Sequence, residues 1–303
     1  MNLYTTFLGT SFKSPIVLSS GILGVTAASM NRAIQNGCGG VTVKSISLTP
    51  RTGHPNPTMI GSEHFFLNAV GLSNPGIDEA LGELKQFKTL TNAPLIGSIF
   101  AGTADEFAHM AERISKAPID FLEVDISCPN VGNEFGDPFA YSIPAIEAIT
   151  KKVKAKSRVP ISMKLSPNAW NIAELAKAAE AAGADAITAV NTVSGMAIDV
   201  RARMPILHNK QGGISGRALF PIALNCVYQI YKSVKIPIIG TGGITTGEDA
   251  LAMIMAGATL LGVGSAVYYR GETAFQQIAD EMKNIMDEEG IKTLEEIRGI
   301  VHK

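Results

Sequence analysis

The sequence PIIGTGG at residues 237–243 is a short apolar run that ends in two glycines, and seven comparable runs occur along the chain. These are PIVLSSG (15–21), GVTVKS (40–45), PLIGSIF (94–100), FLEVDIS (121–127), PISMKLS (160–166), AITAVNT (186–192) and LLGVGSA (260–266). Runs of this length that are rich in β-branched residues and do not alternate suit strands buried on both faces. Eight of them, alternating with helices, predict an α/β fold, a (β/α)8 TIM barrel with its active face at the strand C-termini.

The segments between these runs fit the same fold. Residues 104–116, 171–182 and 247–256 have apolar or small residues at helical spacing, and the second of these segments ends at Gly183. Glycine at that place commonly caps a helix in the left-handed conformation. No linker or low-complexity stretch divides the chain, so we expect one barrel domain over residues 1–303.

The connections between runs are uneven in length, which predicts inserted loops after strands 2, 4 and 6. The extra residues after the second and sixth strands are 48–81 and 194–215, and both segments are rich in Gly, Pro, Asn and Ser. The loop after the fourth strand begins at Cys128. Inserted loops at the C-terminal face of a barrel commonly build the substrate site.

The bulk properties exclude several classes of function. A formal net charge of -1 gives no general attraction to nucleic acid or to acidic membranes. The first residues, MNLYTTFLGTSF, do not resemble a signal peptide, and no apolar run approaches the ~20 residues that span a bilayer. Cys38, Cys128 and Cys226 cannot all pair and show no CxxC spacing. We therefore expect a cytoplasmic protein with no nucleic-acid partner, no membrane partner and no metal site.

The exits of strands 7 and 8 are rich in glycine and predict a phosphate site at Gly242, Gly243, Gly264 and Ser265. Glycine lets backbone N–H groups approach an anion closely, and the N-terminus of a following helix adds a favourable dipole. Barrels frequently bind phosphate at these two strands. The alternative is that the glycines only form tight turns, and a phosphate alone does not distinguish a sugar phosphate, pyridoxal phosphate or FMN.

Two lysines stand at the ends of otherwise apolar strands. Lys44 and Lys164 are costly to bury there without an anionic partner, and either could stabilise negative charge on a reduced flavin. The alternatives are a side chain that reaches solvent at the barrel rim, or a Schiff-base lysine, which the neighbouring residues fit less well.

Among the cysteines, Cys128 differs from the other two. Free cysteines are most often small buried hydrophobic residues, which is the expectation for Cys38 and Cys226. Cys128 follows the fourth strand, on the active face, in a loop with several glycines and prolines. It could act there as a nucleophile or as a general base.

Nine short motifs in order give the chain a specific resemblance. They are SSG (19–21), VKS (43–45), NAVGLSNPG (68–76), ISCPN (126–130), MKLSPN (163–168), NT (191–192), GGISG (212–216), GTGGI (240–244) and GVGSA (262–266). With these motifs the chain resembles the class 1 dihydroorotate dehydrogenases, FMN enzymes that make orotate for pyrimidine (UMP) biosynthesis. The segments NEFGDP (133–138) and MAIDVRARMPILHNKQGGISG (196–216) resemble subtype B, as its catalytic subunit.

The resemblance implies a role for each matching residue. Cys128 would be the base that removes a proton from C5 of dihydroorotate while the C6 hydride passes to FMN. The substrate would be bound by Lys44, Asn68, Ala69, Val70, Gly71, Leu72, Asp125, Asn191 and Thr192. FMN would be bound by Ser20, Lys44, Ser45, Ser98, Asp125, Lys164, Val190, Gly216, Gly242, Gly243, Gly264 and Ser265.

The resemblance also implies a partner. Subtype B members pair with an electron-transfer subunit that carries FAD and a [2Fe-2S] cluster and reacts with NAD, as homodimers within a heterotetramer. This chain shows no G-x-G-x-x-G dinucleotide fingerprint, and its three cysteines are too few for a conventional cluster. Both observations are consistent with a need for that partner.

Two residues depart from the family pattern. Asp125 stands where asparagine is usual, and an ionised aspartate accepts hydrogen bonds without donating them. Beside the orotate anion we expect Asp125 to be protonated by burial, or held by a cationic or N–H donor, unless the substrate differs. Ser98 stands where many subtype B members have asparagine, and its hydroxyl could still bond a flavin edge.

Two other functions stay open at this point. One is an FMN barrel that acts on another dihydropyrimidine or on dihydrouridine, although a tRNA-acting enzyme should carry a basic surface or an RNA-binding domain. The other is a non-redox phosphate-binding barrel, such as an isomerase or aldolase, or a silent subunit. It would explain the glycine loops but not the Cys128 loop together with NAVGLSNPG.

Overall fold

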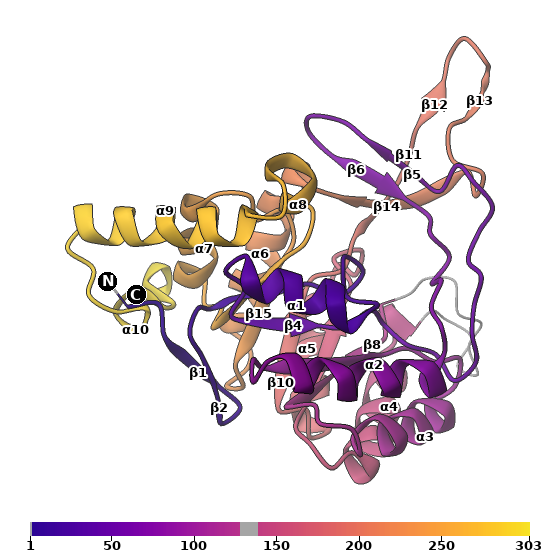
Figure 1. The fold of residues 1–303 in the computed structure, drawn as a ribbon, viewed down its shortest axis with the longest axis horizontal. Coiled ribbons are helices and arrows are strands. Elements are labelled where there is room, and N and C mark those ends of the chain that lie inside the picture. The colour runs from indigo at the N-terminus through magenta and orange to yellow at the C-terminus, as the bar shows by residue number, and fades with distance from the viewer. Residues whose placement is uncertain (1, 128–138) are drawn as a thin grey trace.

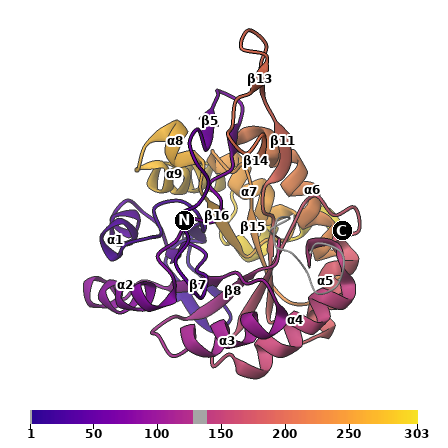
Figure 2. The ribbon, with the colours of Figure 1, turned by 90° about the vertical axis from the view of Figure 1, so that its right-hand side faces the viewer.

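In the computed structural model, which describes residues 2–127 and 139–303, the eight apolar runs form one closed parallel barrel. The strand order around the barrel is β10-β15-β16-β3-β4-β7-β8-β9, and helices surround it (Figure 2). The strands are β3 (Ile16–Leu18), β4 (Gly40–Thr42), β7 (Leu95–Ile99), β8 (Phe121–Asp125), β9 (Ile161–Leu165), β10 (Ala186–Ala189), β15 (Ile238–Thr241) and β16 (Leu260–Val263). The predicted TIM barrel is therefore confirmed.

The helices form the outer layer. They are α1 (Ala27–Gln35), α2 (Ile77–Leu90), α3 (Ala104–Ile114), α4 (Ile143–Lys156), α5 (Ile172–Ala181), α6 (Phe220–Tyr231), α7 (Gly247–Met255), α8 (Ala266–Arg270), α9 (Ala274–Glu288) and α10 (Leu294–Ile297). The three predicted helical segments correspond to α3, α5 and α7, and Gly183 follows α5 with φ +103°. Helix α3 shows why they form, because Phe107, Met110 and Ile114 recur at helical spacing on its buried face. None of the helices in the described ranges combines the length and apolar character that a bilayer crossing requires.

A separate core fills the N-terminal end of the barrel. Its residues come from the first half of six barrel strands, and Phe7 and Phe12 join them from the hairpin of β1 (Thr5–Phe7) and β2 (Thr10–Phe12). The rings of Phe7 and Phe121 lie with their centroids 5.2 Å apart. The hairpin therefore closes this end, and a site inside the barrel is accessible only from the opposite, C-terminal end.

The long connections after the second and sixth strands are present, and they contain strands that composition did not indicate. One antiparallel sheet has the order β11-β14-β6-β5, made of β11 (Val193–Met196), β14 (Gln211–Ser215), β6 (Phe66–Asn68) and β5 (Met59–Gly61). A small hairpin of β12 (Ile198–Asp199) and β13 (Met204–Pro205) extends from it (Figure 1). The two insertions pair with each other, Gly213 opposite Asn68, which a local composition signal cannot show. The insertion after the fourth strand falls mostly outside the described residues.

Candidate active site

A cavity of about 800 Å³ opens at the C-terminal ends of the barrel strands, and the inserted sheet completes its wall. Residues just after seven of the eight barrel strands line it, together with residues around β5, β6 and β14. The predicted site residues in its wall are Ser20, Lys44, Ser45, Asn68, Ala69, Val70, Gly71, Leu72, Asp125, Lys164, Val190, Asn191, Thr192, Gly242, Gly243, Gly264 and Ser265. Residues far apart in sequence thus meet at one cavity, as the parallel strands predict.

Two predicted site residues that the structure describes, Ser98 and Gly216, are not in this wall. Ser98 is fully buried beneath it, with its hydroxyl oxygen 2.9 Å from that of Ser45, so it reaches the cavity only through its neighbours. Gly216 lies behind the wall, where its carbonyl would be 2.7 Å from a Cβ atom at Gly243. Both residues therefore lie behind the cavity wall and contact residues that line it. Cys128 lies outside the described residues.

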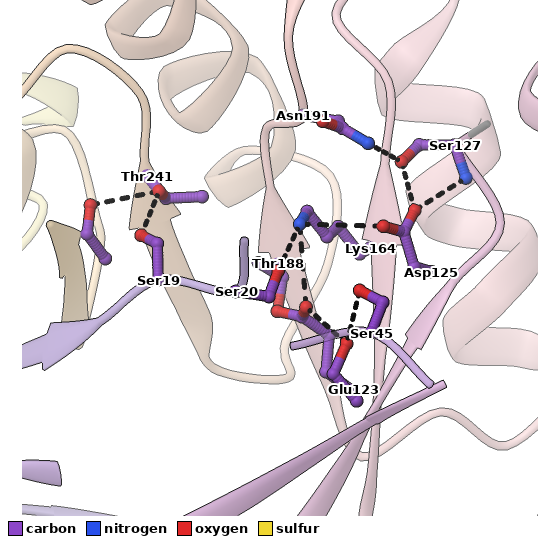
Figure 3. A network of polar contacts seen from close by, with 12 residues as sticks. Ser19, Ser20, Ser45, Glu123, Asp125, Ser127, Lys164, Thr188, Asn191 and Thr241 are labelled. Atoms are coloured by element: carbon purple, nitrogen blue, oxygen red, sulfur yellow. Dashed lines mark hydrogen bonds and ion pairs between the residues drawn. The ribbon is translucent and has the colours of Figure 1, made fainter. Parts of the chain in front are cut away.

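A buried charge cluster forms the floor of the cavity (Figure 3). Asp125 on β8 is the direct neighbour of Lys164 on β9, and Glu123 precedes Asp125 by two residues on the same face. The ammonium Nζ of Lys164 lies 3.5 Å from Glu123 Oε1 and 3.7 Å from Asp125 Oδ2, and it donates a hydrogen bond of 2.8 Å to Ser20 Oγ. The two carboxylates hold this lysine in place.

The state of Lys164 follows from these neighbours. Burial by itself lowers the pKa of Lys164, but the charges of Glu123 and Asp125 outweigh burial and leave the pKa above its ordinary value. The side chain is therefore a cation at neutral pH. It is only 9% exposed, so the alternative of a lysine that reaches solvent is wrong for Lys164. A Schiff-base role, which needs a neutral amine, is also disfavoured.

Asp125 is held by donors on two sides. Its Oδ1 accepts hydrogen bonds from the N–H of Ser127, at 3.1 Å, and from the Ser127 hydroxyl. Asn191 in turn donates from Nδ2 to the Ser127 hydroxyl oxygen at 2.5 Å (Figure 3). A cation and an N–H group thus hold the carboxylate, one of the arrangements expected from sequence. A polar chain connects Lys164 to Asn191 in the cavity wall.

The glycine-rich exits of β15 and β16 form a loop pair at the cavity wall. Gly242 and Gly243 have φ angles of +128° and +76°, which favour glycine. Among the described residues, none accepts a hydrogen bond from the amides of Gly242, Gly243, Gly264 or Ser265. These amides fit an anion such as a phosphate.

The start of α7, the helix after strand 7, does not add to this anion site. The side chain of Asp249 accepts hydrogen bonds from the N–H groups of Thr245 and Thr246. The N–H of Gly247 donates to Glu281. Carboxylates of the chain itself therefore occupy this helix N-terminus. The amides without an acceptor belong to the exits of β15 and β16, and Ser265 among them is the N-cap of α8.

The other side of the cavity is built where the inserted sheet meets the barrel. Asn68 donates from Nδ2 to the carbonyl of Gly213 across the β6–β14 pair, at 3.3 Å. Asn168, after β9, donates to the carbonyl of Thr192 and accepts from the N–H of Ser194. The first bond joins the two insertions to each other, the Asn168 bonds tie the second insertion to the barrel, and residues 68–72 line the cavity.

The two described cysteines are remote from this chemistry. Cys38 and Cys226 are both buried, as expected for small hydrophobic residues, and neither lines the cavity. Burial raises the pKa of the Cys38 thiol well above its ordinary value and that of Cys226 to about 11. Both thiols are therefore protonated and unreactive at neutral pH.

Sequence reasoning missed Glu123 and Ser127. Both lie in FLEVDIS, the fourth predicted strand, where positions 121, 123 and 125 point to the same face. Because Asp125 was expected to face the site, the two-residue period places Glu123 on that face as well. This signal was available in the sequence.

Comparisons with known proteins agree on one family. The family model described as "Dihydroorotate dehydrogenase" matches residues 2–286. A "Dihydroorotate dehydrogenase B (NAD(+)), catalytic subunit" of Methanocaldococcus jannaschii is 42% identical over 304 residues, which cover 99% of this chain and 98% of the relative. A protein of the same description from Pyrococcus abyssi is 42% identical, with 97% of each chain covered. A crystal structure of DHODH in complex with ferulenol, from Eimeria tenella, matches with a TM-score of 0.85 and 22% identity, over 99% of this chain and 89% of that one, a likeness of fold.

Proposed function

Because the chain belongs to the dihydroorotate dehydrogenase family, we propose that its site oxidises dihydroorotate to orotate with bound FMN and sends the electrons to NAD through a partner subunit. The activity is that of a B-type dihydroorotate dehydrogenase catalytic subunit, a step of pyrimidine biosynthesis. The observation that carries the cofactor proposal is a cavity that holds both a buried ammonium and a set of unused loop amides. Family membership removes the non-redox barrel from consideration.

FMN fits the groups that the cavity presents. The amides of Gly242, Gly243, Gly264 and Ser265 would bind the phosphate, and Ser20 and Lys164 would bind the flavin ring. When bound, FMN supplies an acceptor for the hydride that leaves C6 of the substrate. Lys164 keeps its positive charge in the buried site, where it can donate to an electron-rich ring atom.

The substrate is proposed to lie against the inserted sheet. Lys44 would pair with its carboxylate, and the amides of Asn68 and Asn191 would bond the polar edge of its ring. Cys128 would take one proton from C5. Loss of this proton and of a hydride from C6 leaves a C5–C6 double bond, which balances the oxidation.

The test of this function is anaerobic reduction of the bound flavin by dihydroorotate. We expect purified protein to show the absorption bands of oxidised flavin, and these bands to bleach when dihydroorotate is added without oxygen. Colourless protein that cannot be reconstituted with FMN would contradict the cofactor. Bound flavin that dihydroorotate leaves oxidised would contradict the substrate.

A further prediction concerns the electron acceptor. We expect the isolated chain to reduce NAD poorly with dihydroorotate as donor, since it lacks a dinucleotide fingerprint and the cysteines for a cluster. Addition of a partner subunit that carries FAD and a [2Fe-2S] cluster should confer NAD reduction, measured as absorbance of NADH. The proposed assembly is a homodimer of this chain within a heterotetramer. Rapid NAD reduction by this chain alone would rule out the two-subunit arrangement.

A further inference from the structure

The charge cluster on the cavity floor contains one cation and two anions. The side chains of Lys164, Glu123 and Asp125 are 9%, 4% and 8% exposed. The Lys164 ammonium has three N–H groups, of which one donates to Ser20 while the two carboxylates lie within 4 Å. The two ion pairs account for the position of Lys164, but the cluster contains one more acidic group than basic groups.

The partners of the two acids are donors and an ammonium, which is the environment of ionised carboxylates. Asp125 accepts from the backbone N–H of Ser127, which can only donate, and faces the ammonium, which can also only donate. The Ser98 hydroxyl donates to Glu123 Oε1 at 3.1 Å, and the same oxygen faces Lys164. The oxygens that make these contacts, Asp125 Oδ1 and Glu123 Oε1, therefore act as acceptors. With both acids ionised, the cluster carries one net negative charge.

We propose that Glu123 and Asp125 together reverse the charge beside the flavin, so that the cluster lowers the reduction potential of bound FMN. The inference rests on the proposed function, in which Lys164 binds the flavin ring. Reduction adds electrons to the ring, and Lys164 alone would favour it. Two carboxylates within 4 Å of the same ammonium oppose that effect, and solvent screens groups this deeply buried much less than exposed groups.

The other charged groups of the cavity wall do not cancel the cluster. Among the described residues they are Lys44, which is partly exposed, and Arg51, which is exposed, and the imidazole of His54 is exposed as well. Water screens charges at such positions more strongly than charges in the barrel interior. A lower potential makes the reduced cofactor a stronger donor, which suits onward transfer to NAD. Glu123 is outside the cavity wall, so it acts on the cofactor only through its charge and through Lys164.

The test is the midpoint potential of bound FMN in the holoprotein, measured by anaerobic equilibration with a dye of known potential. The variants are Asp125→Asn, Glu123→Gln and the double variant, each of which removes charge at nearly constant shape. We expect each single variant to raise the potential and the double variant to raise it further. We expect the removal of each charge to change the ratio of the affinities for reduced and oxidised FMN at least tenfold. For a two-electron couple, a tenfold change corresponds to a shift of about 30 mV.

The single variants also exclude the competing state of the cluster. If the two acids shared one proton, the cluster would be neutral, and replacing either acid by an amide would leave it neutral. Unchanged or lowered potentials in both single variants would therefore overturn the proposal. Glu147→Gln is the matched control, because Glu147 is a half-exposed carboxylate on α4 paired with Lys151. Bound FMN should have the same midpoint potential in this variant as in the original protein.

Failure of this inference is distinguishable from failure of the proposed function. The potential is set with a chemical reductant, so the measurement does not need dihydroorotate. Variants that bind FMN but keep the original potential overturn the role of the cluster and leave the activity standing. If Glu123→Gln does not fold, Asp125→Asn decides alone, since Asp125 lies in the cavity wall and its amide analogue keeps the oxygen that faces Ser127.

Discussion

Replacement of Cys128 by alanine is expected to slow the reduction of bound flavin by dihydroorotate on the order of 10²-fold or more. Hydride loss from C6 becomes easier once C5 begins to lose its proton, so removal of the base raises the barrier of the redox step itself. The cofactor should stay bound, because the groups proposed to hold it are in the barrel strands and their exits. Stopped-flow absorbance under anaerobic conditions measures the rate directly.

The other two cysteines provide the controls. Cys38 and Cys226 are buried and outside the cavity wall, and burial raises the pKa of both thiols. Cys38→Ala and Cys226→Ala should therefore leave the rate of flavin reduction within a few-fold of the original. Equal rates in Cys128→Ala and the original protein would remove this cysteine from the mechanism.

The barrel was predictable because its strands are short, apolar and local. Each of the eight runs carries its own signal, and the parallel closure brings all their C-terminal ends to one face. That rule alone brought Lys44, Lys164, Asn191 and Gly243 into one cavity, although up to about two hundred residues separate them in sequence. The strands, which are local in sequence, and the meeting of their C-terminal ends, which the barrel topology requires, could both be deduced.

Long-range pairing could not be deduced in the same way. The inserted sheet exists because β14 and β6 pair across 145 residues, between Gly213 and Asn68 among others. Their segments are rich in glycine and polar residues, which indicates a loop when each is considered alone. The N-terminal hairpin is similar, since Phe7 and Phe12 were recognisable as core residues only after the barrel end that they fill was known.

The charge cluster could be predicted from the sequence only in part. Asp125 was recognised as a departure, and the need for a cation or N–H donor beside it followed from electrostatics. The identity of that cation did not follow, because Lys164 was assigned to the flavin alone. In the structure the same ammonium contacts the carboxylates and lines the cavity, so Asp125 is electrostatically coupled to the proposed flavin site.

Replacement of Gly243 by valine is expected to yield protein that purifies without FMN. A Cβ atom at this position would lie 2.5 Å from the backbone N of Phe220 and 2.7 Å from the carbonyl O of Gly216, at a φ of +76°. The substituent would therefore collide with the backbone behind the proposed anion site instead of entering it. The loop must move, and its amides move with it. Loss of two hydrogen bonds to a charged phosphate, at about 1.5–3 kcal/mol each, weakens FMN binding by about 10²-fold or more.

Gly271 provides a matched control for this prediction. Its φ is +74°, so valine costs similar backbone strain there, but a Cβ atom would meet nothing within 4 Å. Gly271→Val should keep its flavin, whereas Gly243→Val should lose it while retaining the circular dichroism of the fold. Fluorescence titration with FMN gives Kd for both variants. Full flavin occupancy in Gly243→Val would place the phosphate elsewhere, and equal loss in both variants would show that strain, rather than displacement of the phosphate loop, governs cofactor binding.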